Sequence, residues 1–341
     1  MSRVYLDYNA TAPLRPEARA AMEAAMDIVG NPSSVHGEGR AAKALVERAR
    51  AQVAAAAGCM PQEVVFTSGA TEAAGVLQHW PGRVDVQPTA HDAVFAHGRE
   101  ANTGTPILAM GLANSETGIL TDPPKPHSGA LLLDITQALG RVPFSFAWSE
   151  ADRAICSAHK LGGPKGVGAL IVKQGIDITS LSLGGGQEMG RRSGTENIIG
   201  IAGFGAAVEA AQKDLDDGLW ARVEKLRNIL ETILVNSTEG LIFVGEKGPR
   251  LPNTSCLIAP GWKGETQVMA MDLAGFAVSA GSACSSGKVK ASRVLAAMGF
   301  DDADAASAVR VSLGPETTEE MVERFAETWV RGYKKHRARA A

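Results

Sequence analysis

One lysine of the sequence stands where a side-chain amine could form an imine with an aldehyde. Lys160 follows an apolar run that is predicted to be a strand and precedes a glycine-rich loop, in the segment Ser157-Ala158-His159-Lys160-Leu161-Gly162-Gly163. An imine-forming lysine needs a fixed position and a depressed pKa, and the end of a buried strand can supply both. A single lysine at a strand end is more often an ordinary solvated side chain, so Lys160 alone decides nothing.

Two further segments carry groups that an aromatic phosphate would need. Ser68-Gly69-Ala70-Thr71 lies between a predicted strand and a predicted helix, where backbone N–H groups and the helix dipole can bind a phosphate. Asp134 ends a buried apolar strand, and its carboxylate needs a partner such as a protonated pyridine nitrogen. Each has an ordinary alternative, because the first segment could be a simple helix N-cap and Asp134 could pair with an arginine or cap a helix.

The elements that must position these residues alternate along the first two thirds of the chain. Continuous apolar strands between helical or loop segments are typical of a largely parallel sheet covered on both faces, which is an α/β fold. The apolar runs predict strands over 63–67, 107–113, 130–133, 153–156 and 167–172, and the spacing of apolar residues predicts helices over 16–30 and 39–57.

The last third of the chain predicts a smaller α+β domain. We expect a large domain over residues 12–218 and a small domain formed by residues 1–11 and 219–341. The elements expected in the small domain are a helix over 219–235, strands over 241–244 and 254–258, a helix over 265–273, and a final helix after the capping sequence Thr317-Thr318-Glu319-Glu320.

The composition is that of a globular protein without a marked charge bias. Of the 341 residues, 45% are hydrophobic and 21% are charged, and the net charge is -3. No global field directs the chain to nucleic acid or to a membrane surface. No apolar run is long enough to span a bilayer, and the N-terminus lacks the apolar stretch of a signal peptide, so we expect a cytoplasmic protein. The four cysteines form no C-x-x-C pair, which argues against a metal site or a disulfide framework.

Together the motifs resemble those of the cysteine desulfurases of the class V aminotransferase family, in particular the type that supplies iron–sulfur cluster assembly. The resemblance covers nearly the whole chain. It implies a bound pyridoxal 5'-phosphate and the aspartate-aminotransferase-like fold (fold type I), with a mostly parallel central sheet flanked by helices and a smaller α+β domain. The matching motifs are residues 5–11, 30–34, 66–72, 134–137, 157–160, 185–188, 192–197, 279–287 and 310–314.

The resemblance also implies which residues bind the cofactor. Lys160 would carry the cofactor and later move the Cα proton of the substrate. Asp134 would pair with the pyridine nitrogen, Gln137 would contact the phenolic oxygen of the ring, and His91 would stack on the ring. The phosphate would be bound by Ala70, Thr71, Ser157 and His159, and Thr195 would reach the phosphate of the neighbouring subunit in a homodimer.

Two residues would determine the substrate. Arg310 would bind the carboxylate of L-cysteine, since a guanidinium offers two parallel donors. Cys284 lies in a run of Gly, Ser and Ala, which favours a mobile and accessible loop, and its thiolate would take the sulfur as a persulfide while L-alanine is released. A sulfur-acceptor protein, such as a cluster scaffold, would then receive that sulfur. Cys59 and Cys256 follow apolar stretches and fit a structural role.

Two departures from the family pattern keep alternatives open. Where the family has two asparagines before a glutamate, this chain has Asn114 and Ser115, and a serine at the substrate site offers fewer hydrogen bonds. The stretches 72–114 and 118–131 are shorter than in the family. The alternatives are a selenocysteine lyase, a small-amino-acid aminotransferase, and a non-catalytic scaffold with this fold. A transaminase has no need of Cys284 in a flexible loop. A non-catalytic scaffold would not need all five of the residues Lys160, Asp134, His91, Cys284 and Arg310.

Overall fold

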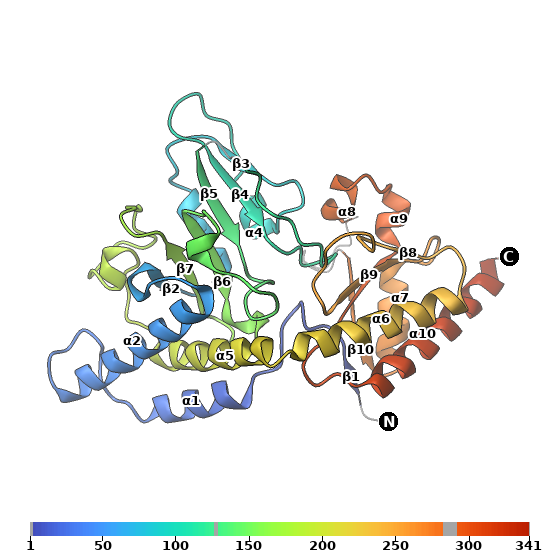
Figure 1. Cartoon of the computed structure of the whole chain (residues 1–341), viewed down its shortest axis with the longest axis horizontal. Coiled ribbons are helices and arrows are strands. Elements are labelled where there is room, and N and C mark those ends of the chain that lie inside the picture. The colour runs from blue at the N-terminus through green and yellow to red at the C-terminus, as the bar shows by residue number, and fades with distance from the viewer. Residues whose placement is uncertain (1–2, 126–128, 282–291, 341) are drawn as a thin grey trace. The chain divides into compact units, whose positions relative to one another are not determined.

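The computed structural model describes residues 3–125, 129–281 and 292–340 (Figure 1). The chain divides into two compact units. The first, called the six-strand unit here, consists of Thr11–Ala113 and Thr121–Asp217. The second, called the four-strand unit, consists of Met1–Ala10, Asn114–Leu120 and Gly218–Ala341. The short segment Asn114–Leu120 thus interrupts the six-strand unit in sequence.

A central sheet organises the six-strand unit. Its strands are β2 (Val64–Thr67), β3 (Val84–Val86), β4 (Ile107–Gly111), β5 (Ala130–Asp134), β6 (Arg153–Ser157) and β7 (Gly168–Val172). Their order is β2-β7-β6-β5-β4-β3. The strands from β6 to β3 are parallel, as predicted, whereas β7 is antiparallel to both of its neighbours. The short connection from β6 to β7 explains the exception, because a parallel return needs a longer crossover.

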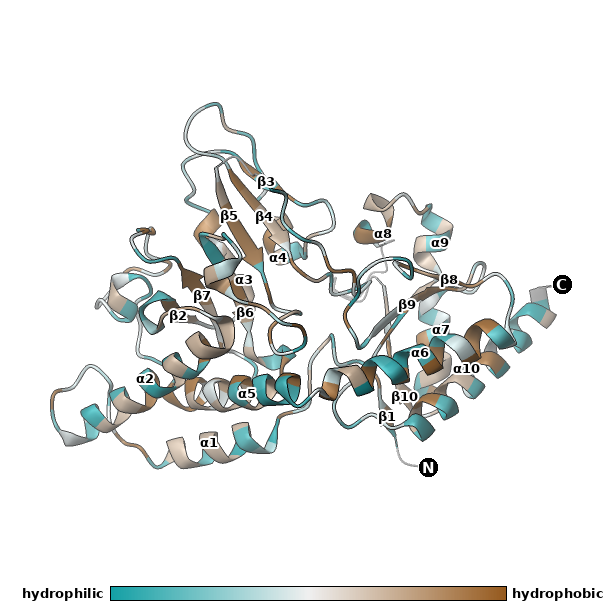
Figure 2. Ribbon diagram, in the orientation of Figure 1, coloured by the Kyte–Doolittle hydropathy of each residue, from teal (hydrophilic) through white to brown (hydrophobic). Residues whose placement is uncertain are grey.

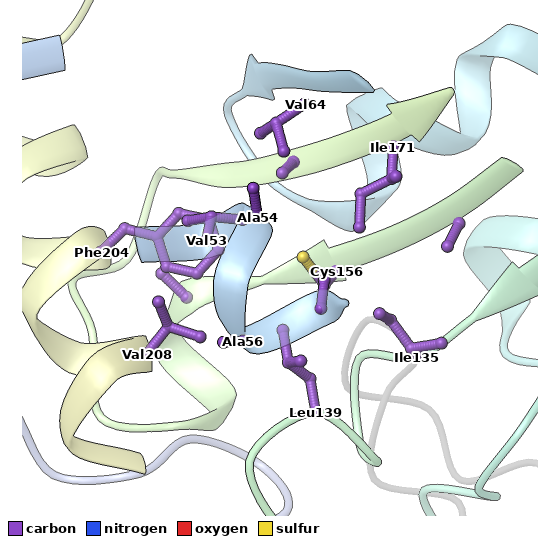
Figure 3. Packing of buried hydrophobic residues seen from close by; sticks show 14 of the residues in the cluster. Val53, Ala54, Ala56, Val64, Ile135, Leu139, Cys156, Ile171, Phe204 and Val208 are labelled. Atoms are coloured by element: carbon purple, nitrogen blue, oxygen red, sulfur yellow. The ribbon is translucent and has the colours of Figure 1, made fainter. Parts of the chain in front are cut away.

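Helices cover both faces of this sheet. They are α1 (Pro16–Met26), α2 (Gly37–Ala57), α3 (Ala70–Ala74), α4 (Asp92–Phe95) and α5 (Ile198–Asp216). On one face, Val53 of α2 and Phe204 of α5 pack with Cys156 in the larger apolar core (Figure 3). On the other face, α3 and α4 pack on alternate residues of the same strands, including Leu132. Most residues of these strands are therefore apolar, and Figure 2 shows β4 and β5 largely in brown.

Two helices differ from the sequence prediction. α1 ends at Met26 and not at Gly30. A Cβ at Gly30 would lie 1.8 Å from the Glu38 carbonyl oxygen, so the chain has already turned there to pack against the start of α2. α5 was not predicted, because its glycines lower helix propensity. Gly205 has a packing reason: a Cβ there would lie 2.8 Å from Ala49 of α2.

The four-strand unit is named after its larger sheet, and it also contains a second sheet of two strands. Its strands are β1 (Val4–Tyr5), β8 (Ile242–Phe243), β9 (Thr254–Ile258), β10 (Phe276–Ala277), β11 (Ser279–Ala280) and β12 (Ala308–Ser312). An antiparallel sheet has the order β11-β12-β9-β8, and β1 pairs with β10 in parallel. Its helices are α6 (Leu219–Ser237), α7 (Gly264–Leu273), α8 (Arg293–Ala297), α9 (Asp302–Ala306) and α10 (Glu319–Ala340).

The start of α10 confirms the capping sequence predicted for the last helix. The backbone N–H of Met321 donates to Thr318 Oγ1 at 3.3 Å, which satisfies one of the unpaired donors of the first turn. Deeper in the helix, Trp329 is fully buried and donates from Nε1 to Gln267 Oε1 at 3.0 Å. Within the described part of the chain, no helix has the length and apolarity needed to cross a membrane.

Candidate active site

The carboxyl ends of β5 and β6 carry the central pair of predicted residues. Asp134 is the last residue of β5 and pairs with Ile155 of β6, which ends at Ser157. Lys160 closes the single turn Ala158–Lys160 that follows β6, and it is half-buried. Because neighbouring parallel strands end at the same edge of a sheet, the lysine segment and the carboxylate come to that edge together.

The Asp134 carboxylate forms no ion pair with any residue that the structure describes. Its Oδ1 accepts a hydrogen bond from the Thr136 N–H at 2.9 Å. The Thr136 hydroxyl is itself buried and has no partner in the described chain. A partly buried carboxylate needs a positive or hydrogen-bonding partner, so the site fits the protonated nitrogen of a pyridine ring.

Arg141 connects the two strand ends and was not singled out in the sequence. Its Nη1 donates to Gln137 Oε1 at 2.7 Å, and its Nη2 donates to the backbone carbonyl of Lys160 at 2.7 Å. Arg141 and Gln137 are both buried. A guanidinium can only donate hydrogen bonds, so the Gln137 amide presents its oxygen to Arg141. The NH2 group of the amide therefore points away from Arg141. The only sequence signal was an arginine placed four residues after Gln137.

Hydrogen-bond donors gather where α3 begins. A Cβ on Gly69 would lie 3.7 Å from Ser157 Oγ, and a Cβ on Gly168 would lie 2.7 Å from the Gly69 Cα. The last residue of β6 and the first residue of β7 therefore pack directly on the loop before α3. The first N–H groups of α3, at Ala70 and Thr71, have no carbonyl partner within the helix. Together with the Ser157 hydroxyl they form a donor set suited to a phosphate.

His159 is held in its neutral form. Its Nδ1 lies 3.2 Å from Thr11 Oγ1. Burial, with the neighbouring charges of Lys160, Lys165 and Arg141, lowers the pKa of His159 to about 4. At neutral pH the ring can therefore hydrogen-bond to an anion without adding a charge of its own. Thr11 belongs to one of the matching motifs, but the sequence did not indicate this contact.

His91 and Thr195 lie on exposed segments of the six-strand unit. His91 is the N-cap residue of α4, and its Nδ1 accepts a hydrogen bond from the Ala93 N–H at 3.1 Å. This contact uses the edge of the imidazole and not its face. The loop that contains Thr195 is attached to α3, because Arg192 Nε donates to Glu72 Oε1 at 2.8 Å.

Arg310 belongs to the four-strand unit, where it is buried in β12. Its Nη2 donates to Asp7 Oδ1 at 2.7 Å, and its Nη1 donates to the backbone carbonyl of Ser115 at 3.0 Å. Ser279 Oγ donates to the other Asp7 oxygen at 2.8 Å. These two Nη contacts hold the guanidinium in place, and the buried Arg310 Nε has no partner among the described residues. Asp7 lies in a matching motif, but its pairing with Arg310 could not be predicted from the sequence.

Asn114 stabilises a turn through its side chain, and Ser115 accepts hydrogen bonds at its backbone carbonyl. Asn114 Oδ1 accepts hydrogen bonds from the N–H groups of Glu116 and Thr117, both at 2.9 Å, which stabilises the turn. Ser115 contacts Arg310, and also Asn9 Nδ2 at 3.2 Å, through its backbone carbonyl. These carbonyl contacts do not depend on the side chain, so they tolerate a serine where the family has an asparagine.

Cys284 lies in the segment 282–291, outside the described residues. The other cysteines have a shared property. Burial raises the pKa of Cys59, of Cys156 and of Cys256 to about 12 in each case. A thiol with such a pKa is not ionised at neutral pH and is a poor nucleophile, which is consistent with structural roles for Cys59 and Cys256.

The comparison with known proteins decides the family. The aminotransferase class-V family matches residues 4–103 and 99–325. The chain belongs to the aminotransferase class-V family. A cysteine desulfurase of Frankia sp. (strain EuIK1) is 39% identical to it over 95% of this chain and 90% of that protein. A cysteine desulfurase of Cereibacter sphaeroides is 37% identical over 96% of this chain and 95% of that protein. The solved structure of a NifS-like protein from Rickettsia africae ESF-5 has a TM-score of 0.89 and 30% identity, covering 97% of this chain and 99% of that one.

Membership of the class-V family confirms two predictions made from the motifs. The fold is that of the pyridoxal-phosphate enzymes of fold type I, with a mostly parallel central sheet covered by helices. The cofactor of the family is pyridoxal phosphate. The Asp134 carboxylate, which has no ion-pair partner among the described residues, and the donor set at the start of α3 fit the two polar ends of that molecule. The alignment with the Frankia protein spans 380 positions against 341 residues here, in keeping with shortened segments.

Proposed function

We propose that this protein is a pyridoxal-phosphate-dependent cysteine desulfurase, which converts L-cysteine and a protein thiol into L-alanine and a persulfide. The observation that carries the proposal is the half-buried Lys160 after the end of β6, beside the neighbouring strand that ends in the Asp134 carboxylate. The full-length similarity to cysteine desulfurases supports the choice of substrate within the family.

The residues of the six-strand unit would bind the cofactor. When bound, pyridoxal phosphate supplies an electron-accepting ring that stabilises negative charge at the substrate Cα. Lys160 would hold the cofactor through Nζ and move the Cα proton, and Asp134 would keep a positive charge on the ring nitrogen. Gln137 would donate to the phenolic oxygen, and the face of His91 would stack on the ring. The phosphate would be bound by Ala70, Thr71, Ser157 and His159, with Thr195 contributed by the partner subunit of a homodimer.

The four-strand unit would bind the substrate. Arg310, oriented by Asp7, would receive the carboxylate of L-cysteine, and Asn114 and Ser115 would border the same group. The thiolate of Cys284 would attack the substrate sulfur. An S–S bond forms, the C–S bond of the substrate breaks, and its electron pair takes up a proton to complete L-alanine. The persulfide sulfur would then pass to an acceptor protein for iron–sulfur cluster assembly or for a thiolation pathway.

An alanine-release assay tests this proposal. Purified protein is incubated with L-cysteine, alanine is quantified, and the persulfide is located by mass spectrometry. We expect Cys284→Ala to abolish alanine formation and to leave the near-visible, borohydride-sensitive absorption intact. Cys59→Ala is the matched control, because burial raises the pKa of that partly exposed thiol to about 12. Equal alanine release by the wild type and Cys284→Ala would refute the desulfurase assignment.

A further inference from the structure

The turn after β5 holds Arg141 in a fixed place. The N–H of Ala138 donates to the Ile135 carbonyl at 3.0 Å, and the N–H of Arg141 donates to the Ala138 carbonyl at 2.9 Å. Gly140 has φ 72°, and a Cβ there would lie 2.7 Å from the Cβ of Ala211 in α5. The turn is therefore pressed against α5 at a position that requires glycine, and Arg141 has little freedom to move.

The guanidinium of Arg141 reaches two residues that the cofactor needs. It donates to the Gln137 side chain and to the backbone carbonyl of Lys160, at 2.7 Å in both cases. Both acceptors are neutral oxygens, and hydrogen bonds from a charged donor to buried oxygens are strong. One side chain thus fixes the amide of Gln137 and the backbone that carries the lysine.

We propose that Arg141 is a positioning residue for the cofactor: it orients Gln137 so that Nε2 faces the phenolic oxygen of the ring, and it anchors the turn that carries Lys160. This inference rests on the proposed function. With Arg141 present, the amide can only offer N–H donors to the ring oxygen, which favours the deprotonated oxygen. Without Arg141, the amide can rotate and present its own oxygen, which repels a phenolate.

Several charged groups share this edge of the sheet and will influence any titration. They are Asp134 at the end of β5, and His159, Lys160 and Lys165 after β6. The pKa of His159 is lowered to about 4, so it does not titrate near neutral pH. A change in the titration of the chromophore near neutral pH is therefore attributable to the lysine–cofactor group and its oxygen contact.

A matched control exists in the same segment. Arg15 Nε donates to the backbone carbonyl of Leu161 at 2.8 Å, and its Nη2 pairs with Asp214 at 2.6 Å. Arg15 therefore holds the carbonyl next to that of Lys160, but its hydrogen bonds go to Leu161 and Asp214. If anchoring of the backbone were the whole role of Arg141, loss of Arg15 would produce a similar change.

The test compares the holoenzymes of the wild type, Arg141→Met, Arg141→Lys and Arg15→Met. Near-visible absorption is titrated against pH, and cofactor release is followed by dialysis. We expect Arg141→Met to raise the chromophore pKa by roughly one unit and the cofactor dissociation constant by about tenfold, as for one lost hydrogen bond to a charged group. Arg141→Lys keeps the charge and is expected to be intermediate, and Arg15→Met is expected to match the wild type.

A double-substitution cycle shows whether Arg141 acts through Gln137. We expect Gln137→Ala to raise the chromophore pKa, and we expect Arg141→Met to add little in the Gln137→Ala background. Additive shifts, a wild-type titration in Arg141→Met, or an equal shift in Arg15→Met would overturn the inference. If even the wild type forms no borohydride-sensitive chromophore, the proposed function fails as well, and that result is distinct because every variant is then colourless.

Discussion

A buried arginine lies near each end of strand β6, Arg141 at the carboxyl end and Arg153 at the amino end. The two guanidinium groups differ in their hydrogen bonds. At the carboxyl end, the Lys160 carbonyl and the Gln137 amide are held by Arg141. At the amino end, Arg153 is buried, and its Nε has no hydrogen-bond partner within the described residues. Its guanidinium lies 4.6 Å from the centre of the Trp80 ring, beside a pocket that Asp152 also lines.

The difference shows what each end of the strand is suited for. Burial lowers the pKa of Arg153, and Asp152 only partly opposes that effect. A buried cation without full hydrogen bonding contributes little to stability, although stacking on an aromatic ring is favourable. At the carboxyl end, the hydrogen bonds of Arg141 fix the Gln137 amide and the Lys160 backbone in place. A cofactor site requires side chains that are held in this way.

The largest effect is expected at the carboxyl end, for Lys160→Ala. Without the amine that holds the cofactor and moves the Cα proton, we expect alanine release from L-cysteine to fall by at least about 10³-fold. The borohydride-sensitive absorption should also disappear. Lys165→Ala is the control, because that lysine is exposed and lies five residues further along the same segment. Retention of the chromophore in Lys160→Ala would contradict the assignment of Lys160.

The two arginines give a direct contrast in stability. Arg141→Met leaves the Gln137 and Lys160 oxygens without their donor, and we expect the free energy of unfolding to fall by about 2–4 kcal/mol. Arg153→Met removes a poorly satisfied buried charge and keeps an apolar contact with Trp80. We expect it to change the free energy of unfolding by less than about 1 kcal/mol, in the stabilising direction.

Urea unfolding of the three proteins at pH 7 measures both values in one series. If Arg153→Met were destabilised as much as Arg141→Met, the expected difference between the two ends of β6 would be contradicted. That result would mean that the Arg153 guanidinium has a strong partner in solution.

The smallest effect concerns the pH dependence of stability through His159. The pKa of His159 is about 4 in the folded protein and near the ordinary value of 6.5 in the unfolded chain. Between these values the unfolded chain binds more protons, so stability is full above pH 6.5 and decreases as the pH falls toward 4. The loss should be at most about 2 kcal/mol, well below the full linkage value, because the ring is partly solvated.

This decrease is measured by urea unfolding of the cofactor-free protein at several pH values between 7 and 4.5. His159→Gln cannot be protonated, so its stability should decrease less over the same range. Parallel curves for the two proteins would show that His159 retains an ordinary pKa despite its burial.

Much of the six-strand unit could be predicted because its signals are local. Apolar runs identified β4 to β7 within a few residues, and the strand ends at Asp134 and Ser157 follow from where those runs stop. The helix α5 was missed, because the close packing of its glycines on α2 outweighs their low helix propensity.

The sequence alone determined the order of the elements, the family motifs, and the residue types at positions 134 and 160, since side-chain chemistry and apolar periodicity are read along the chain. Only the tertiary structure decided which groups hold them. The contacts of Arg141 with Lys160 and of Asp7 with Arg310 join residues 19 and 303 positions apart. Such pairings depend on the register and packing of distant segments, and no local pattern in the sequence encodes them.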